Sequence, residues 1–62
     1  MIQIGTRVGY IGPTVERPWL PRGTEGVVTD FFPGTPFPII CNFNVPEGDD
    51  WPMQRRDLEV IR

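Results

Sequence analysis

The apolar residues of this chain occur in short clusters that Pro and Gly separate at close intervals. The chain has 62 residues, of which eight are Pro and seven are Gly. No window of about 11 residues places apolar positions at the 3.6-residue spacing of an amphipathic helix, so we expect no helix beyond a single turn. The segments between the breakers are rich in β-branched and aromatic residues, which favour strands.

The pattern predicts five strands, joined by one long loop, two turns and a single helical turn. The predicted strands span residues 6–11, 25–32, 37–43, 51–54 and 58–61. The long loop spans residues 12–24, the turns span 33–36 and 46–50, and the helical turn spans 54–57. The loop contains three prolines, which favour extended and rigid backbone.

Alternation within the strands predicts which side chains share a face. Val8 and Tyr10 lie on one face of the first strand, because successive side chains of a strand point to opposite sides. In the third strand, Phe37, Ile39, Cys41 and Phe43 share one face, while Pro38, Ile40, Asn42 and Asn44 share the other. The second strand does not alternate strictly, which indicates a bulge or bend, or burial of both faces at one end. Pro52 implies that the fourth strand is an edge strand or bulged.

Three short motifs carry a family resemblance. The motifs are Gly-Thr-Arg-Val at 5–8, Gly-Thr-Glu-Gly-Val-Val-Thr at 23–29 and Asp-Leu-Glu-Val-Ile at 57–61. With the long first loop and the helical turn before the last strand, these motifs resemble small SH3-like barrel domains of bacteria, phages and plasmids. The resemblance implies an all-β, five-stranded SH3-like barrel that spans residues 1–62 as one domain. Because many unrelated activities share this barrel, it implies no particular function.

Composition narrows the range of functions. Sixty-two residues lie near the lower limit for independent folding, so self-association into a homo-oligomer is one way for this chain to bury more surface. One Cys and no His make zinc binding and an internal disulfide poor hypotheses. The net charge is −2 and the six basic residues are dispersed Arg, which disfavours nucleic acid as a partner. No signal peptide or transmembrane segment is readable, so we expect a cytoplasmic protein that binds no membrane.

The sequence offers little material for catalysis. General acid–base chemistry at neutral pH usually recruits His or a tuned Lys or carboxylate, and the chain contains neither His nor Lys. Cys41 lies in the middle of a predicted strand and is expected to be a core residue. The acidic tip, Glu47, Asp49 and Asp50, lacks the regular ligand spacing of calcium loops and is expected to be a solvated turn. We therefore expect no enzyme activity, no metal site and no cofactor.

The aromatic residues are the feature with binding potential. Seven aromatic side chains are more than a barrel of this size can enclose, so some are expected to lie at least partly outside. The first loop and the loop between the second and third strands border one surface of such a barrel, and aromatic residues there, with Arg17 or Arg22 at the rim, would bind protein. The candidate binding residues are Tyr10, Trp19, Arg22, Phe32, Phe37 and Trp51. The alternative interpretation is that these rings cover the ends of the barrel and pack on the prolines.

Three functional hypotheses follow. The favoured one is a non-enzymatic interaction module, a small accessory protein of bacterial or phage origin that docks on a protein partner. The first alternative is a nucleic-acid-binding small barrel, in which aromatic rings stack on bases and Arg contacts phosphates. The second is a minimal oligomeric enzyme of the type II dihydrofolate reductase kind, although residues 51–54 read Trp-Pro-Met-Gln where that family has a Val-Gln-Ile-Tyr strand.

Overall fold

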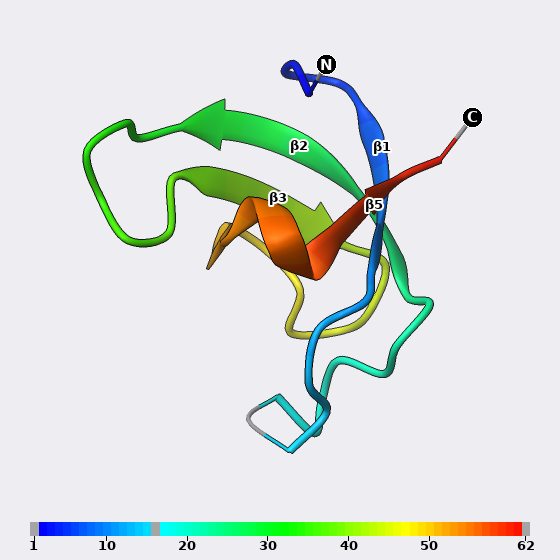
Figure 1. Ribbon diagram of the computed structural model, residues 1–62. Coiled ribbons are helices and arrows are strands. Elements are labelled where there is room, and N and C mark those ends of the chain that lie inside the picture. The colour runs from blue at the N-terminus through cyan, green and yellow to red at the C-terminus, as the bar shows by residue number, and fades with distance from the viewer. Residues whose placement is uncertain (1, 16, 62) are drawn as a thin grey trace.

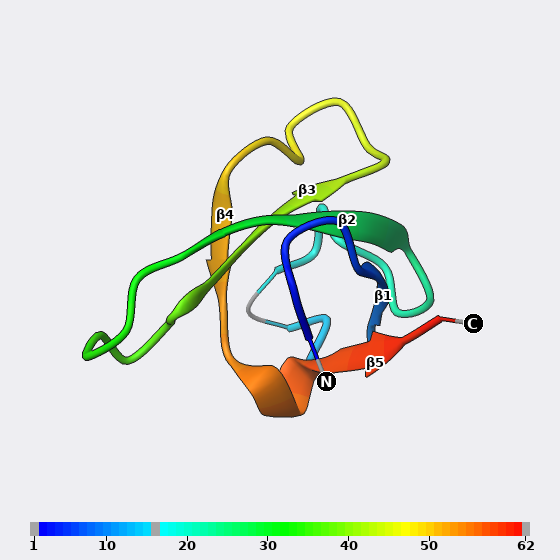
Figure 2. The same ribbon diagram turned by 90° about the horizontal axis from the view of Figure 1, so that it is seen from above.

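Five antiparallel strands form one sheet that curls into a half-barrel (Figures 1 and 2). The computed structural model describes residues 2–15 and 17–61. In chain order the elements are β1 (Arg7–Tyr10), β2 (Glu25–Phe31), β3 (Ile39–Phe43), β4 (Trp51–Met53), the 3-10 turn η1 (Arg55–Asp57) and β5 (Leu58–Val60). The strand order in the sheet is β4-β3-β2-β1-β5. The predicted all-β fold, with its long first loop and a single helical turn before the last strand, is confirmed.

The predicted strands are one or two residues too long at several ends. The largest difference is in β3, which begins at Ile39 and not at Phe37. The backbone N–H of Phe32 donates a hydrogen bond of 2.8 Å to the carbonyl of Pro38, and this bond closes the loop between β2 and β3. Phe37 therefore belongs to the loop. In both ribbon views this hairpin extends away from the rest of the molecule.

The irregular second strand contains the predicted bulge. The register between β2 and β3 shifts between Val28 and Asp30, so Thr29 lies outside the regular pairing. Beyond the shift, the Asp30 carboxylate accepts a hydrogen bond of 2.8 Å from the N–H of Phe31. Because a bulge increases the local twist, it turns the end of the hairpin relative to the rest of the sheet.

Pro52 lies on an edge strand, as predicted. It pairs with Ile40 of β3, and β4 has no second neighbour in the sheet. The N–H of Phe43 donates on the β4 side of β3, to the carbonyl of Gly48. Because the N–H and C=O groups of successive strand residues point to alternate sides, those of Ile40 point toward β2. Ile40 and Pro52 are therefore a pair without hydrogen bonds between them, and the backbone C=O of Pro52 points to the free edge. A proline at this position removes a donor from the edge, which disfavours pairing with another chain.

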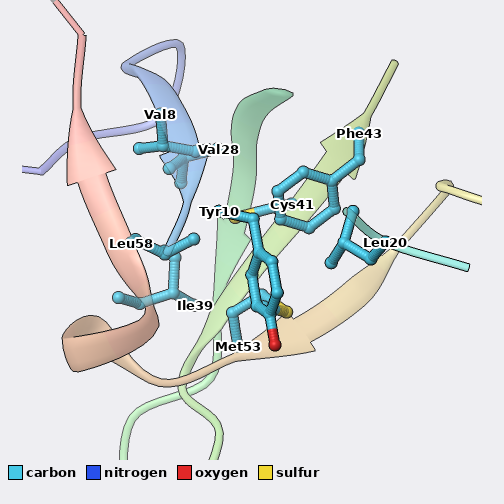
Figure 3. Packing of buried hydrophobic residues seen from close by; sticks show 9 residues of the cluster. All are labelled: Val8, Tyr10, Leu20, Val28, Ile39, Cys41, Phe43, Met53 and Leu58. Atoms are coloured by element: carbon cyan, nitrogen blue, oxygen red, sulfur yellow. The ribbon is translucent and has the colours of Figure 1, made fainter. Parts of the chain in front are cut away.

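The core lies on the concave side of the sheet (Figure 3). Val8, Tyr10, Val28, Cys41 and Met53 have no exposed surface. The remaining core side chains are Leu20, Ile39, Phe43 and Leu58. The predicted face of β1 is confirmed, because Val8 and Tyr10 point into the core. That of β3 is confirmed for Ile39, Cys41 and Phe43 and is wrong for Phe37, which the loop leaves exposed.

The loop between β1 and β2 closes one end of the half-barrel (Figures 1 and 2). Its two ends are joined by hydrogen bonds from the N–H of Gly23 to the carbonyl of Tyr10 (2.7 Å) and from the N–H of Tyr10 to the carbonyl of Thr24 (2.9 Å). Leu20, in the middle of the loop, is fully buried. No helix within the described residues is long and apolar enough to cross a membrane.

Candidate functional site

The hairpin between β2 and β3 presents two exposed aromatic side chains. Phe32 is 53% exposed and Phe37 is 38% exposed. Together they line a pocket of about 360 Å³ that is open to solvent. We call it the hairpin groove, and its lining residues are Phe32, Thr35, Pro36, Phe37, Ile40, Asp50 and Pro52.

The floor of the hairpin groove is the outer face of the sheet. Ile40 of β3 and Pro52 of β4 form this floor and are paired with each other. Asp30 of β2 is the partner of Ile40 on its other side and does not line the groove. Ile40 alternates with the core residues Ile39 and Cys41, so its side chain points out of the barrel, where the surrounding groove leaves it only 9% exposed. Asp50 is the acidic residue of the lining, and its backbone N–H is held by the side-chain oxygen of Asn42 at 2.8 Å.

A second pocket adjoins the hairpin groove at Phe37, which lines both. Its volume is about 330 Å³, and it lies where the first loop meets the turn η1. We call it the arginine pocket, and its lining residues are Pro13, Arg17, Phe37, Gln54, Arg56 and Asp57. It contains two guanidinium groups and one carboxylate.

The neighbouring residues Arg55 and Arg56 have different surroundings. The Arg55 guanidinium donates a hydrogen bond of 2.8 Å to the carbonyl of Leu58, which fastens the turn η1 to the start of β5. Among the residues that the structure describes, Arg7 and Glu25 form an ion pair, with 2.7 Å between guanidinium nitrogen and carboxylate oxygen. This pair lies on β1 and β2, away from the arginine pocket. Arg17 and Arg56 line the pocket and form no ion pair with a described carboxylate.

Asp57 lies at the inner end of the arginine pocket and is only 8% exposed. Its carboxyl group lies close to Gly12 and to the Tyr10 hydroxyl. A Cβ atom added to Gly12 would lie 2.7 Å from that hydroxyl and 2.9 Å from the carboxyl carbon of Asp57. The hydroxyl itself donates to the carbonyl of Pro13 at 2.6 Å. These contacts join the first loop to the turn η1, and only glycine at position 12 allows them.

The two Trp residues lie together and line neither pocket. Trp19 of the first loop stacks on Trp51 of β4, with ring centroids 4.4 Å apart and planes inclined by 35°. Both are partly buried against the core cluster. The Trp51 indole N–H donates to the carbonyl of Glu47. The pair therefore covers part of the core, which favours the interpretation that these rings close the barrel.

The structure divides the six candidate binding residues into four groups. Phe32 and Phe37 meet at the hairpin groove. Trp19 and Trp51 form the stacked pair. Tyr10 is fully buried, with its ring edge against Phe43 at 6.2 Å between centroids, so we correct its assignment from surface residue to core residue. Arg22 is exposed but lines neither pocket, whereas Arg17, the alternative rim residue, lines the arginine pocket.

Sequence reasoning missed Ile40, Pro52, Gln54 and Arg56 as lining residues. A signal for Ile40 was present, because alternation in the third strand places it on the face opposite the core, and an isoleucine there indicates a covered or binding surface. Arg56 had no comparable signal. The direction of its side chain depends on the turn η1, which also directs the adjacent Arg55 to a backbone carbonyl.

Two further candidate groups show no sign of reactivity. Cys41 is free and fully buried, and this burial raises the pKa of its thiol from 9.0 to about 11. A protonated thiol in the core is a poor nucleophile. Within residues 2–15 and 17–61, no three acidic or Cys side chains gather closely enough to hold a metal ion, and this includes the acidic tip at 47–50.

Comparisons with protein families, with curated proteins and with solved structures give no match to this chain.

Proposed function

We propose that this protein is a non-enzymatic interaction module that docks on a protein partner through the hairpin groove. The observation that carries the proposal is the pair of exposed rings, Phe32 and Phe37, that line an open apolar pocket. A volume of about 360 Å³ lies in the range of pockets that hold a ligand group. Exposed apolar surface in a concave and well-formed site is typical of protein-binding surfaces.

The hairpin groove is also mechanically suited to docking. Its floor is the strand pair Ile40 and Pro52, which the hydrogen-bonded strands β2, β3 and β4 hold in place. A rigid site loses little conformational entropy when a partner binds. Four prolines in the hairpin and in β4, at positions 33, 36, 38 and 52, restrict the backbone further.

We further propose that the protein acts in the cytoplasm, as a small accessory protein of bacterial or phage origin. Its one cysteine is free and buried, which suits a reducing compartment. The resemblance to SH3-like domains supports the origin and stays a prediction.

Affinity capture from cells of the source organism tests the docking function. The immobilised protein should retain a partner that the Phe32→Ser and Phe37→Ser variants lose. Val15→Ser is the matched control, because Val15 is 90% exposed and lines neither pocket. Capture that is equal for the wild type and the Phe32→Ser variant would contradict the proposal. So would capture at the level of the empty support.

A further inference from the structure

The charges around the hairpin groove differ at its two ends. At one end, Asp50 supplies a carboxylate. At the other end, beyond Phe37, the arginine pocket supplies two guanidinium groups against the sheltered carboxylate of Asp57. The groove thus runs from a site of charge −1 to a site of charge +1 across an apolar centre.

From this arrangement we infer that the partner is an acidic peptide segment, and that Arg17 and Arg56 bind its Asp or Glu side chain while a neighbouring apolar side chain fills the hairpin groove. The inference rests on the proposed docking function and names the chemistry of the partner. Guanidinium groups suit this role because their N–H donors match the geometry of a carboxylate. Binding by two such groups beside an apolar wall strengthens the contact, because the wall excludes water.

The same charges determine the direction of the bound segment. A carboxylate next to Asp50 would be repelled, whereas one next to Arg17 and Arg56 is attracted. The acidic residue of the partner therefore lies on the side of the turn η1. The partner's apolar side chain fills the groove, and the partner residue on the other side of it, next to Asp50, is neutral or basic. Phe37 separates the two contacts, so the anchor and the acidic residue are neighbours or near neighbours in the partner's sequence.

The described surface contains a useful internal comparison. Arg22 belongs to the same loop as Arg17 and is exposed, but it lines neither pocket. Arg17→Gln and Arg22→Gln remove the same charge from the same loop, so long-range electrostatic attraction changes almost equally in both. A difference between these two variants therefore reports a local contact in the arginine pocket.

An array of synthetic peptides with acetylated and amidated ends tests the inference. Each peptide places one Leu, Phe or Pro within three residues of Glu, in a Gly-rich background, and matched peptides carry Gln or Lys in place of Glu. The blocked ends ensure that every carboxylate is a side chain. We expect the best Glu peptides to bind roughly ten-fold more tightly than their Gln counterparts, and the Lys peptides to bind most weakly.

Variants assign the contacts. The Arg17→Gln/Arg56→Gln double variant should reduce the preference for Glu over Gln to less than about two-fold, while Arg22→Gln leaves it unchanged. Phe32→Ser should weaken all the peptides that bind. Circular dichroism of each variant confirms that the fold is intact.

The possible failures are distinguishable. An array on which no Glu peptide exceeds its Gln counterpart overturns the inference, and so does a preference for Lys. The docking function would still stand if cellular capture depended on Phe32, and it fails if that capture does not depend on Phe32. If the isolated protein forms dimers that Phe32→Ser dissociates, the occupant of the groove is a second copy of the chain, which also overturns the inference.

Discussion

Cys41 illustrates at the scale of one residue how burial controls chemistry. Its thiol has no exposed surface, and burial raises its pKa from 9.0 to about 11. The folded protein therefore keeps the proton to a higher pH than the unfolded chain does. Between these two values the unfolded state has lost the proton and the folded state has not, so the free energy of unfolding falls as the pH rises.

The prediction is a loss of stability on the order of 2 kcal/mol between pH 9 and pH 11 that a Cys41→Ala variant does not show. Urea denaturation at a series of pH values measures it, and the difference between the two proteins isolates the thiol. In the native state a thiol reagent should label Cys41 slowly, and in urea quickly. Rapid labelling of the folded protein would show that Cys41 is accessible.

The aromatic residues separate by role at the same scale. Trp51 stacks on Trp19 and covers the core, whereas Phe32 leaves about half of its side chain in solvent. We expect Trp51→Ala to lower the free energy of unfolding by about 2–3 kcal/mol, because it removes buried contacts. Phe32→Ser should lower it by less than about 1 kcal/mol. Thermal or urea unfolding distinguishes these values, and equal costs for both would contradict the separation.

At the scale of the strands, close backbone contact explains why position 26 of β2 is glycine. A Cβ atom there would lie 2.5 Å from the carbonyl oxygen of Asn42 and 3.1 Å from the Cα atom of Phe43. Both atoms belong to the backbone of β3, so they cannot move without disturbing the sheet. Gly9 in β1 is the matched control, because its added Cβ would meet the side chain of Ile61 at an ordinary 3.6 Å.

Gly26→Ala should therefore lower the free energy of unfolding by about 2 kcal/mol or more, since overpacking of this kind strains the backbone. Gly9→Ala should change it by less than about 1 kcal/mol. Urea unfolding of the two variants under identical conditions provides the comparison. Equal stabilities would mean that β2 and β3 approach each other less closely.

The apolar pattern and the positions of Pro and Gly predicted the strands and turns well, but they predicted the binding site less well. The face of β3, the bulge in β2 and the edge position of Pro52 all follow from alternation and from the missing N–H of proline, which are local properties. Whether a ring is buried depends on segments distant in sequence. Tyr10 is enclosed because Leu20 and the 3-10 turn close over it, and no local pattern around position 10 contains that information.

At the scale of the whole molecule, the distribution of charge bears on the nucleic-acid alternative. The net charge is −2, Arg7 is paired with Glu25, and Arg55 is bonded to a carbonyl. Two guanidinium groups in one pocket give few phosphate contacts, and affinity for nucleic acid grows with their number. The described surface is thus better suited to a single carboxylate than to a polyanion.

We accordingly expect no saturation of a fluorescein-labelled single-stranded oligonucleotide below about 100 µM protein at near-physiological salt. Fluorescence anisotropy measures the binding directly. Micromolar binding that weakens steeply with added salt, and that the Arg17→Gln/Arg56→Gln variant loses, would instead support a nucleic-acid-binding barrel.

The central claim is that the hairpin groove is the docking surface of the molecule. Amide chemical-shift mapping of the isotope-labelled protein, titrated with its captured partner or with the best peptide of the array, tests this claim most directly. The largest shifts are predicted for the lining residues around Phe32, Thr35, Phe37 and Ile40, and the amides of Arg7 and Glu25, in the opposite part of the sheet, should stay in place. Shifts that spare the β2–β3 hairpin, or that gather instead around Arg7 and Glu25, would contradict the account.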